Sequence, residues 1–414
     1  MADIYEYLKW RGDLNLMVSP LNEVDAYILS KFGVLNYTGI IPKKSGIVLS
    51  DAVKEFNEAA EKNENLLHGF SENNLTVIRA ISQLPRFSSL YVCDYVRKID
   101  ETEDRQFSAL TIVLPDGTRF VTFRGTDDNL VSWKEDLLLT TMDSIPSHED
   151  AYNYLLKQCK KSSSPIIVSG HSKGGNMAIH ASMNIPDKYQ DQIISIFNFD
   201  GPGFRSDLNE SEKFLRIKPK VRKYASQNSI VGRLLVSESS PIIVSTSETG
   251  WRAHNGLNWD IDTVSFTRAD EFSSTSNAMQ AAFNSSVDAI PMERRKDFID
   301  EFFNTLYENG VHMFTDLNRK KLQELSSQSP EVYRSQEVRA LISALSKGYL
   351  QEAVANVVNS LPTPPKPKIS SRRLSRLHEK IKGSKNVISI DDNDTSEEQQ
   401  STDSDTLDKG VDHS

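Results

Sequence analysis

Cysteine is nearly absent from this chain, with only Cys93 and Cys159 among 414 residues. Cys93 lies in a strand-like run and Cys159 in a helix-like one, so the sequence predicts two buried free thiols, typical of a reducing compartment. Long apolar runs are missing as well, since no stretch approaches the roughly 18 apolar residues of a membrane-spanning helix. The first ten residues carry Asp3 and Glu6 and lack the apolar segment of a signal peptide. We therefore expect a cytoplasmic protein.

A basic excess and the common ligand motifs are missing too. Asp and Glu number 57 against 48 Lys and Arg, giving a formal net charge of −9, so we expect no nucleic-acid partner. The metal motifs H-E-x-x-H and C-x-x-C are absent, as are the phosphate-binding patterns G-x-x-x-x-G-K-[ST] and G-x-G-x-x-G. We expect neither a metal nor a cofactor.

Glycine and serine are instead concentrated in one short run, Gly170-His171-Ser172-Lys173-Gly174, which fits the pattern G-x-S-x-G. A β-branched run over residues 165–169 precedes it, and a helical stretch over 176–183 follows. Strand, tight turn and helix are the context of a nucleophile elbow, in which a strained turn lifts the serine hydroxyl above the sheet. The pattern therefore predicts Ser172 as a nucleophile. The alternative is a glycine-tolerant strand-to-helix connection without chemistry.

The N-terminal segment, residues 1–85, is predicted to be helical. Ser19 followed by Pro20 has the form of an N-cap with proline at the first helical position, and Ser50 and Ser71 are predicted as two further caps. One helical face is formed by apolar residues at the expected spacing, namely Leu21, Val24, Ile28 and Phe32.

Strands are predicted in the middle of the chain. The first three cover residues 91–99, 107–114 and 119–124, with a turn at Pro115-Asp116-Gly117-Thr118 between the last two. Shorter ones follow the elbow at 192–198, 220–225 and 241–244. Residues 130–145 are expected as a loop or short helices, and 151–161, 292–307 and 336–358 as helices. Together these segments indicate an α/β fold, an α/β-hydrolase-type sheet with flanking helices.

The C-terminal segment has a different composition. Residues 361–368 form a proline-rich linker, a basic block runs from Lys366 to Lys385, and an acidic tail from Asp391 to Ser414 is too polar to pack and is predicted to be disordered. The basic block could attract an anionic membrane surface, which would make the protein peripheral to a membrane, or it could merely be solvated. The predicted organisation is a helical part (1–85), a hydrolase core (86–265), a helical region (266–360) and the linker with its tail (361–414).

A serine nucleophile needs a base, and chain order restricts the choice. In α/β-hydrolases the serine comes first, then the acid, then the histidine. Only His254 and His312 follow Ser172 at a suitable distance outside the elbow helix and the tail. His254 lies in a loop after the last strand-like runs, where the base is expected, and His312 in a helical region is the second choice.

Several segments resemble a known family. They are Phe123-Arg124-Gly125-Thr126, then Trp133, Glu135 and Asp136, then the elbow, and finally Phe199-Asp200-Gly201-Pro202-Gly203-Phe204. This set resembles a branch of bacterial lipase-like α/β-hydrolases that looks related to the class 3 lipases, over roughly the first 265 residues. The resemblance also implies His254 as the base. For the oxyanion, the elbow predicts the backbone N–H of Lys173, and Thr126 matches the position of the second donor in class 3 lipases.

The acid of the set has two interpretations. Class 3 lipases have an aspartate one strand later, where this chain has Ser229. Asp200 ends the predicted strand after the elbow, near the upper edge of the sheet, and could replace the missing acid. Otherwise the site works as a dyad and Asp200 caps the turn that follows it. We predict catalytic Ser172, His254 and Asp200 in a serine hydrolase acting on an ester or lipid. The alternative is an inactive hydrolase fold with a binding or regulatory role.

Overall fold

The computed structural model describes residues 2–67, 72–288, 290–313, 316, 317, 321 and 324. The chain divides into two units, Met1–Pro362 and Thr363–Ser414, and all described residues belong to the first. Four predicted features lie outside the described residues: the helix over 336–358, the proline-rich linker, the basic block and the disordered tail. Among the described helices, none has the length and apolar character needed to cross a membrane.

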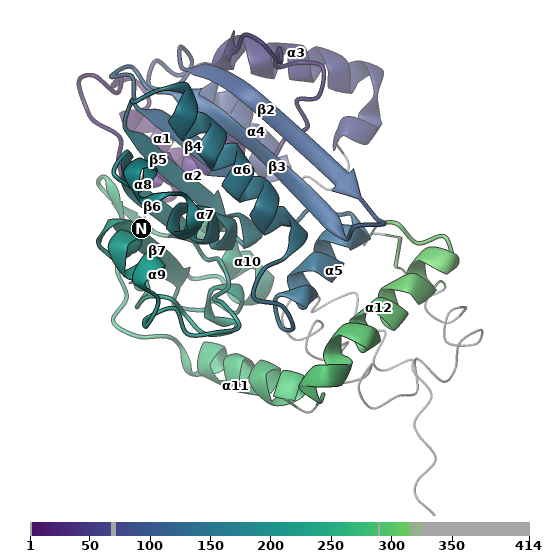
Figure 1. Cartoon of the computed structure of the whole chain (residues 1–414). Coiled ribbons are helices and arrows are strands. Elements are labelled where there is room, and N and C mark those ends of the chain that lie inside the picture. The colour runs from purple at the N-terminus through teal and green to yellow at the C-terminus, as the bar shows by residue number, and fades with distance from the viewer. Residues whose placement is uncertain are drawn as a thin grey trace, which may run out of the picture. The chain divides into compact units, whose positions relative to one another are not determined.

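An eight-stranded sheet forms the centre of the described chain, and its strand order follows the chain order (Figure 1). Neighbours from β1 to β4 pair antiparallel, and neighbours from β4 to β8 pair parallel. The strands are β1 (Ile47–Val48), β2 (Tyr91–Asp100), β3 (Arg105–Val113), β4 (Arg119–Phe123), β5 (Ile166–His171), β6 (Ile193–Phe199), β7 (Val221–Ser226) and β8 (Ile242–Val244). The predicted α/β class and all six predicted strands are confirmed.

The helices between the parallel strands cover one face of the sheet. Right-handed crossovers that always advance in the same direction place their helices on the same side, and Figure 1 shows α6 and α7 in front of the sheet. These helices are α5 (Leu130–Leu138), α6 (Pro146–Lys161), α7 (Lys173–Asn184), α8 (Asp187–Gln190) and α9 (Glu212–Ile217). Apolar residues of α6, α7 and α9 share one buried cluster with Phe107, Val121, Val168 and Ile196 of the sheet.

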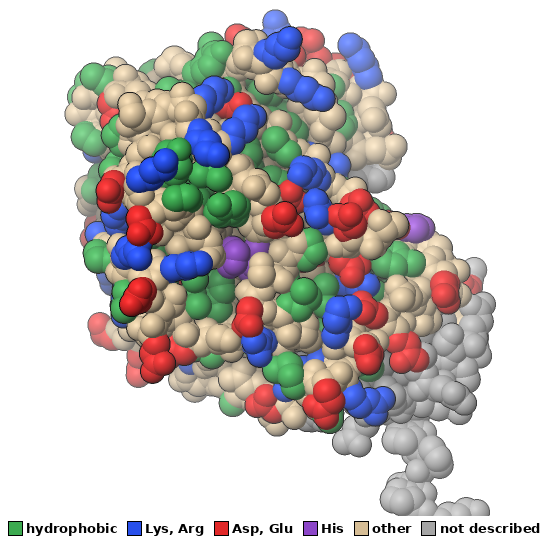
Figure 2. Space-filling view, viewed as in Figure 1, with side chains coloured by type: hydrophobic (Ala, Val, Ile, Leu, Met, Phe, Trp, Pro, Cys, Tyr) green, Lys and Arg blue, Asp and Glu red, His purple; other side chains and the backbone are tan. Residues whose placement is uncertain are grey.

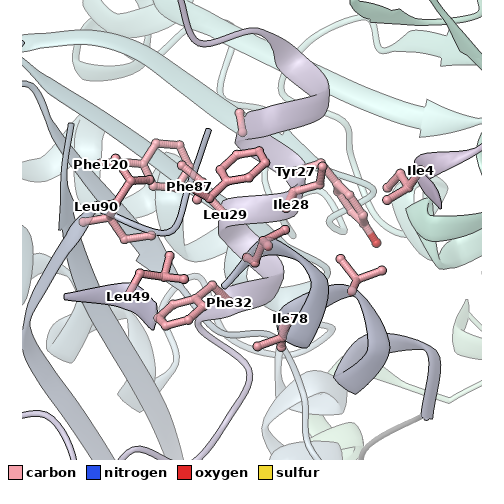
Figure 3. Packing of buried hydrophobic residues seen from close by; sticks show 14 of the residues in the cluster. Ile4, Tyr27, Ile28, Leu29, Phe32, Leu49, Ile78, Phe87, Leu90 and Phe120 are labelled. Carbon is pink, nitrogen blue, oxygen red and sulfur yellow. The ribbon is translucent and has the colours of Figure 1, made fainter. Parts of the chain in front are cut away.

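This winding leaves the opposite face uncovered, and the N-terminal helices pack there. They are α1 (Ile4–Arg11), α2 (Glu23–Phe32), α3 (Leu49–Lys62) and α4 (Glu72–Ile81), with the 3-10 turn η1 (Glu64–Leu67). Figure 3 shows Tyr27, Ile28, Leu29 and Phe32 of α2 packed among Phe120 of β4 and other apolar residues. The described part of residues 1–85 holds these four helices and the short strand β1, and the helices cover the face of the sheet that the crossovers leave bare.

The predicted starts of two of these helices are wrong. The N-cap of α2 is Asn22, whose side chain accepts from the N–H groups of Val24 and Asp25 while Asp25 accepts from the N–H of Asn22. This reciprocal box satisfies more backbone donors than Ser19 could. Helix α3 begins at Leu49, directly after β1, so Ser50 is not its cap either. Ser71 lies outside the described residues.

The remaining elements complete the described chain. They are η2 (Lys218–Lys220), η3 (Val231–Arg233), α10 (Gly250–His254), η4 (Gly256–Asn258), β9 (Ile261–Asp262), β10 (Ser265–Phe266), α11 (Ser274–Asp288) and α12 (Met292–Glu308). The predicted helix over 292–307 is confirmed as α12, whose Phe302 and Leu306 pack with Leu137 and Leu138 of α5 in a third buried cluster. Both cysteines are buried and free, as predicted.

Candidate active site

Ser172 stands at the turn between β5 and α7. Its backbone has φ 58° and ψ −134°, a region that residues with a Cβ rarely adopt, and α7 begins at the next residue. The turn closes tightly, because a Cβ on Gly170 would lie 2.2 Å from the backbone of Gly174. The predicted strand, strained serine and helix are therefore all present. Such strain persists only where the surrounding structure imposes it, and it is concentrated at functional sites.

His254 lies beside the turn that holds this serine, with its ring centre 4.4 Å from that of His171. It is the last residue of α10. The backbone carbonyl of the preceding residue, Ala253, accepts a hydrogen bond from the indole N–H of the buried Trp259. The Nδ1 atom of His254 lies 2.7 Å from Oδ2 of Asp200, with both side chains buried. A carboxylate can only accept, so Nδ1 carries the hydrogen and Nε2 is the nitrogen able to take up a proton.

Asp200 follows β6 directly and also has a left-handed backbone, with φ 52°. Its Oδ1 accepts from the hydroxyl of Ser229 at 2.6 Å, and that hydroxyl accepts in turn from the N–H of Gly232 at 3.0 Å. A Cβ on Gly232 would lie 2.2 Å from Oδ1 of Asp200, so the backbone approaches the carboxylate closely. Ser229, which stands where an aspartate was expected, is thus a donor to the aspartate one strand earlier.

A cavity of about 420 Å³ joins these residues. Both Ser172 and His254 line it, together with Gly125 and Thr126 at the end of β4. The β4 end lies against the elbow, since a Cβ on Gly125 would come within 2.6 Å of the His171 carbonyl oxygen. His312, the second choice for the base, does not line the cavity and pairs with Glu101 at 3.0 Å on the surface.

The two predicted oxyanion donors both lie at the elbow. The hydroxyl of Thr126 donates to Asp136 at 2.6 Å, so its hydrogen is directed there and the backbone N–H is the group that Thr126 offers to a substrate. The Lys173 side chain leaves the cavity and forms a fully buried pair with Glu135 at 2.6 Å, which anchors the start of α7. The group of Lys173 that remains to donate to an oxyanion is therefore its backbone N–H.

His171 connects the elbow to the base. Its Nε2 lies 2.8 Å from the His254 carbonyl oxygen, and because a carbonyl only accepts, Nε2 carries the hydrogen. Burial, followed by the nearby charge of Lys31 and by His254, keeps the pKa of His171 well below its usual value of 6.5. His171 is therefore neutral and holds the α10 end beside the elbow.

Sequence reasoning missed the part of the cavity wall that the N-terminal helices provide. The cavity is also lined by Ser30 and Lys31 of α2 and by Asn73 and Asn74 of α4, although all four lie far before Ser172 in the sequence. One signal was present: Lys31 lies between the apolar residues Leu29 and Phe32 of a predicted helix. Positive and negative side chains are interspersed over the face shown in Figure 2.

Comparisons with known proteins give one family. The Mbeg1-like family model matches residues 81–304, which is more than half of the chain and includes β2 to β8, the elbow, Asp200 and His254. This is a lipase-like family, as the earlier resemblance implied. No curated protein and no solved structure matched the chain. On this match, the chain belongs to the Mbeg1-like family.

Proposed function

We propose that this protein is a serine hydrolase that cleaves carboxylic esters, with Ser172 as nucleophile, His254 as base and Asp200 as the acid that orients the base. One observation carries the proposal: a strained serine at the tip of β5 shares a cavity with a histidine that is bonded to a buried aspartate. The family match supports a lipase-like hydrolase. The specific residues and the ester chemistry are our inference from this geometry.

The reaction follows from the roles of these groups. The Ser172 hydroxyl oxygen attacks the ester carbonyl carbon while its proton passes to Nε2 of His254, and the backbone N–H groups of Lys173 and Thr126 bind the developing oxyanion. His254 then gives the proton to the leaving alkoxide, which departs as an alcohol and leaves an acyl-serine. Water, deprotonated by His254, attacks that ester and releases the carboxylic acid and Ser172. Asp200 stabilises the imidazolium in both halves.

A binding or regulatory module without activity is the other candidate. Two sequence features favour it, the serine at position 229 in place of an acid and the long C-terminal tail. The contacts of Asp200 with His254 and of Ser229 with Asp200 support Asp200 as the acid and so favour the first candidate. We therefore favour the hydrolase.

The test is covalent labelling of Ser172 with a fluorophosphonate, located by peptide mass spectrometry, beside turnover of p-nitrophenyl esters of graded chain length. We expect one label, on Ser172, and a fall in turnover of about 10⁴- to 10⁶-fold in Ser172→Ala. The matched control is Ser163→Ala, at an exposed serine before β5, which should behave as the parent does. Absence of the label, or equal turnover in Ser172→Ala and parent, would contradict the proposal.

A further inference from the structure

Four lysines are buried in the described part of the chain, and one of them differs from the rest. Lys134 pairs with Asp104 and Asp300, each at 2.8 Å. Lys173 pairs with Glu135 at 2.6 Å, and Lys223 with Glu238 at 2.9 Å. The fourth, Lys31, forms no ion pair with any described carboxylate. Burying an ammonium group without a counter-charge is costly, which is why buried charges are paired as a rule.

Lys31 is almost completely shielded from bulk solvent. It lies in the last turn of α2, and only 6% of the residue is exposed. Its ammonium lies over the Tyr27 ring, 5.6 Å from the ring centre. Burial lowers the pKa of Lys31 to about 7, far below its usual 10.5. A lysine kept under such a cost, in a helix that otherwise packs against the sheet, points to a partner that is supplied from outside.

The partner's charge follows from the walls of the cavity. Three of its lining residues are basic (Lys31, Arg124 and Arg252), four are asparagines, and none of those lining it carries a carboxylate. Arg252 is paired with Glu248 and Arg124 lies 3.6 Å from Asp127, both acids lying outside the lining set. Lys31 is thus the lining cation without a described acid beside it. A polar cavity of this composition complements an anion.

Lys31 also lies close to the candidate nucleophile. Its charge helps to depress the pKa of His171, the residue directly before Ser172, and both residues line the cavity with it. His171 is neutral and donates to the His254 carbonyl, so it places no second positive charge beside Lys31 and Ser172. An anionic group held by Lys31 would therefore place the rest of a small molecule near the Ser172 hydroxyl.

We propose that Lys31 binds a carboxylate or phosphate group of the substrate, so that the esters cleaved at Ser172 are anionic ones. This inference rests on the proposed function. Lys31 lies before residue 81, where the match to the family model begins. Lys31 is a specificity-determining residue in this reading, since it contacts the substrate away from the reacting bond.

The first experiment compares substrates that differ only in charge. One pair is mono-p-nitrophenyl adipate and p-nitrophenyl hexanoate, which carry the anion or a methyl group at the end of the acyl chain. A second pair is 1-hexanoylglycerol 3-phosphate and 1-hexanoylglycerol, with the charge on the alcohol side. The parent should prefer the anionic member of at least one pair in kcat/KM. That preference should fall about 10- to 100-fold in Lys31→Met and persist in Lys31→Arg, because a charge-assisted hydrogen bond is lost only in the first. The pair that responds identifies whether a carboxylate or a phosphate is recognised.

The matched control is Lys9→Met, the same substitution at an exposed lysine of α1, which should leave the preference unchanged. Binding is measured separately by calorimetry in Ser172→Ala, which cannot turn the second pair over. There the phosphate ester should bind more tightly than the neutral ester, and Lys31→Met should abolish the difference. Equal binding and equal kcat/KM for charged and neutral esters would overturn the role of Lys31 while leaving the hydrolase intact. Tight anion binding without labelling of Ser172 would uphold the anion site and overturn the hydrolase.

Discussion

Two lysines on opposite sides of the elbow illustrate how differently this fold treats buried charge. Lys173 points into the protein, where Glu135 accepts from its ammonium at 2.6 Å and from the Ser147 N–H at 2.7 Å, and neither charged side chain is exposed. Lys31 points to the cavity and has no described carboxylate beside it. The first region is closed and satisfied by the protein itself. The second is left to be completed by a ligand.

The contrast separates structural residues from candidate chemical ones at neighbouring positions. Ser172 and Lys173 are adjacent, yet one side chain lines the cavity and the other anchors α7 beneath it. Helix α5 contributes a carboxylate to each region. Glu135 pairs with Lys173 on the closed side, and Asp136 accepts from the Thr126 hydroxyl at the cavity wall. Substitutions on the cavity side should therefore change catalysis, and substitutions on the closed side should change stability.

The largest effect on the cavity side, after loss of the nucleophile itself, is expected from Asp200→Asn. Asparagine tolerates the left-handed backbone at this position, so the fold should persist. Loss of the carboxylate removes the acceptor that fixes the His254 tautomer, and kcat should fall about 10³- to 10⁴-fold. The measurement is p-nitrophenyl ester turnover, with circular dichroism as the check on folding. Unchanged turnover in a folded variant would mean that Asp200 does not orient the base.

On the closed side, Glu135→Gln should destabilise the protein by about 3–5 kcal/mol, because it leaves the Lys173 ammonium buried without a counter-charge. Urea unfolding gives the difference. The exposed pair of Glu6 and Lys9 supplies the control, and Glu6→Gln should cost less than about 1 kcal/mol. If both substitutions cost the same, the buried pair does not anchor the elbow as described. Fluorophosphonate labelling of the folded fraction should persist in Glu135→Gln.

Asp136, next to Glu135 on α5, should make the stability of the protein depend on pH. Burial is the main cause that raises the pKa of its carboxyl from 3.8 to about 6. Between pH 3.8 and about pH 6, this carboxyl has lost its proton in the unfolded chain but still holds it in the folded chain. Its contribution to the free energy of unfolding therefore falls as the pH rises through this range. Asp136→Asn removes this penalty. Its unfolding free energy relative to the parent should rise by about 2–3 kcal/mol between roughly pH 4 and pH 7. A difference that is constant with pH would show that Asp136 is not held protonated in the fold.

The smallest effect is expected at Ser229, whose hydroxyl donates a hydrogen bond to the Asp200 carboxylate. Ser229→Ala removes one charge-assisted hydrogen bond of 2.6 Å from the carboxylate, and kcat/KM should fall about tenfold. Ser226→Ala is the control, since this buried serine of β7 forms no hydrogen bond through its hydroxyl within the described residues. It should stay within about twofold of the parent. Equal values for the two variants would mean that Ser229 fills space and does not tune the acid.

Much of the frame could be predicted from the sequence because its signals are local. Alternating and helical periodicity placed β2 to β8 and the N-terminal helices, and the glycines around Ser172 marked a turn that only a strained residue can complete. Chain order reduced the candidate bases to His254 and His312, and the position of His254 after the last predicted strands favoured it. The caps at Ser19 and Ser50 were predicted wrongly, since several local side chains could accept at a helix start and the tertiary contacts decide where the helix begins.

Other features arise only when distant segments meet in space. The sequence left open whether Asp200 or nothing replaced the acid missing at Ser229, and the parallel pairing of β6 with β7 brings the two side chains to a 2.6 Å contact. It likewise gave no reason to connect α2 with Ser172. The one-directional winding of the parallel strands leaves a bare face, α2 covers it, and Lys31 reaches the cavity for that reason. The sequence by itself determined the elbow and the order of the chemical groups. The tertiary structure decided the acid's support and the charge of the cavity, because these depend on distances between residues far apart in the chain.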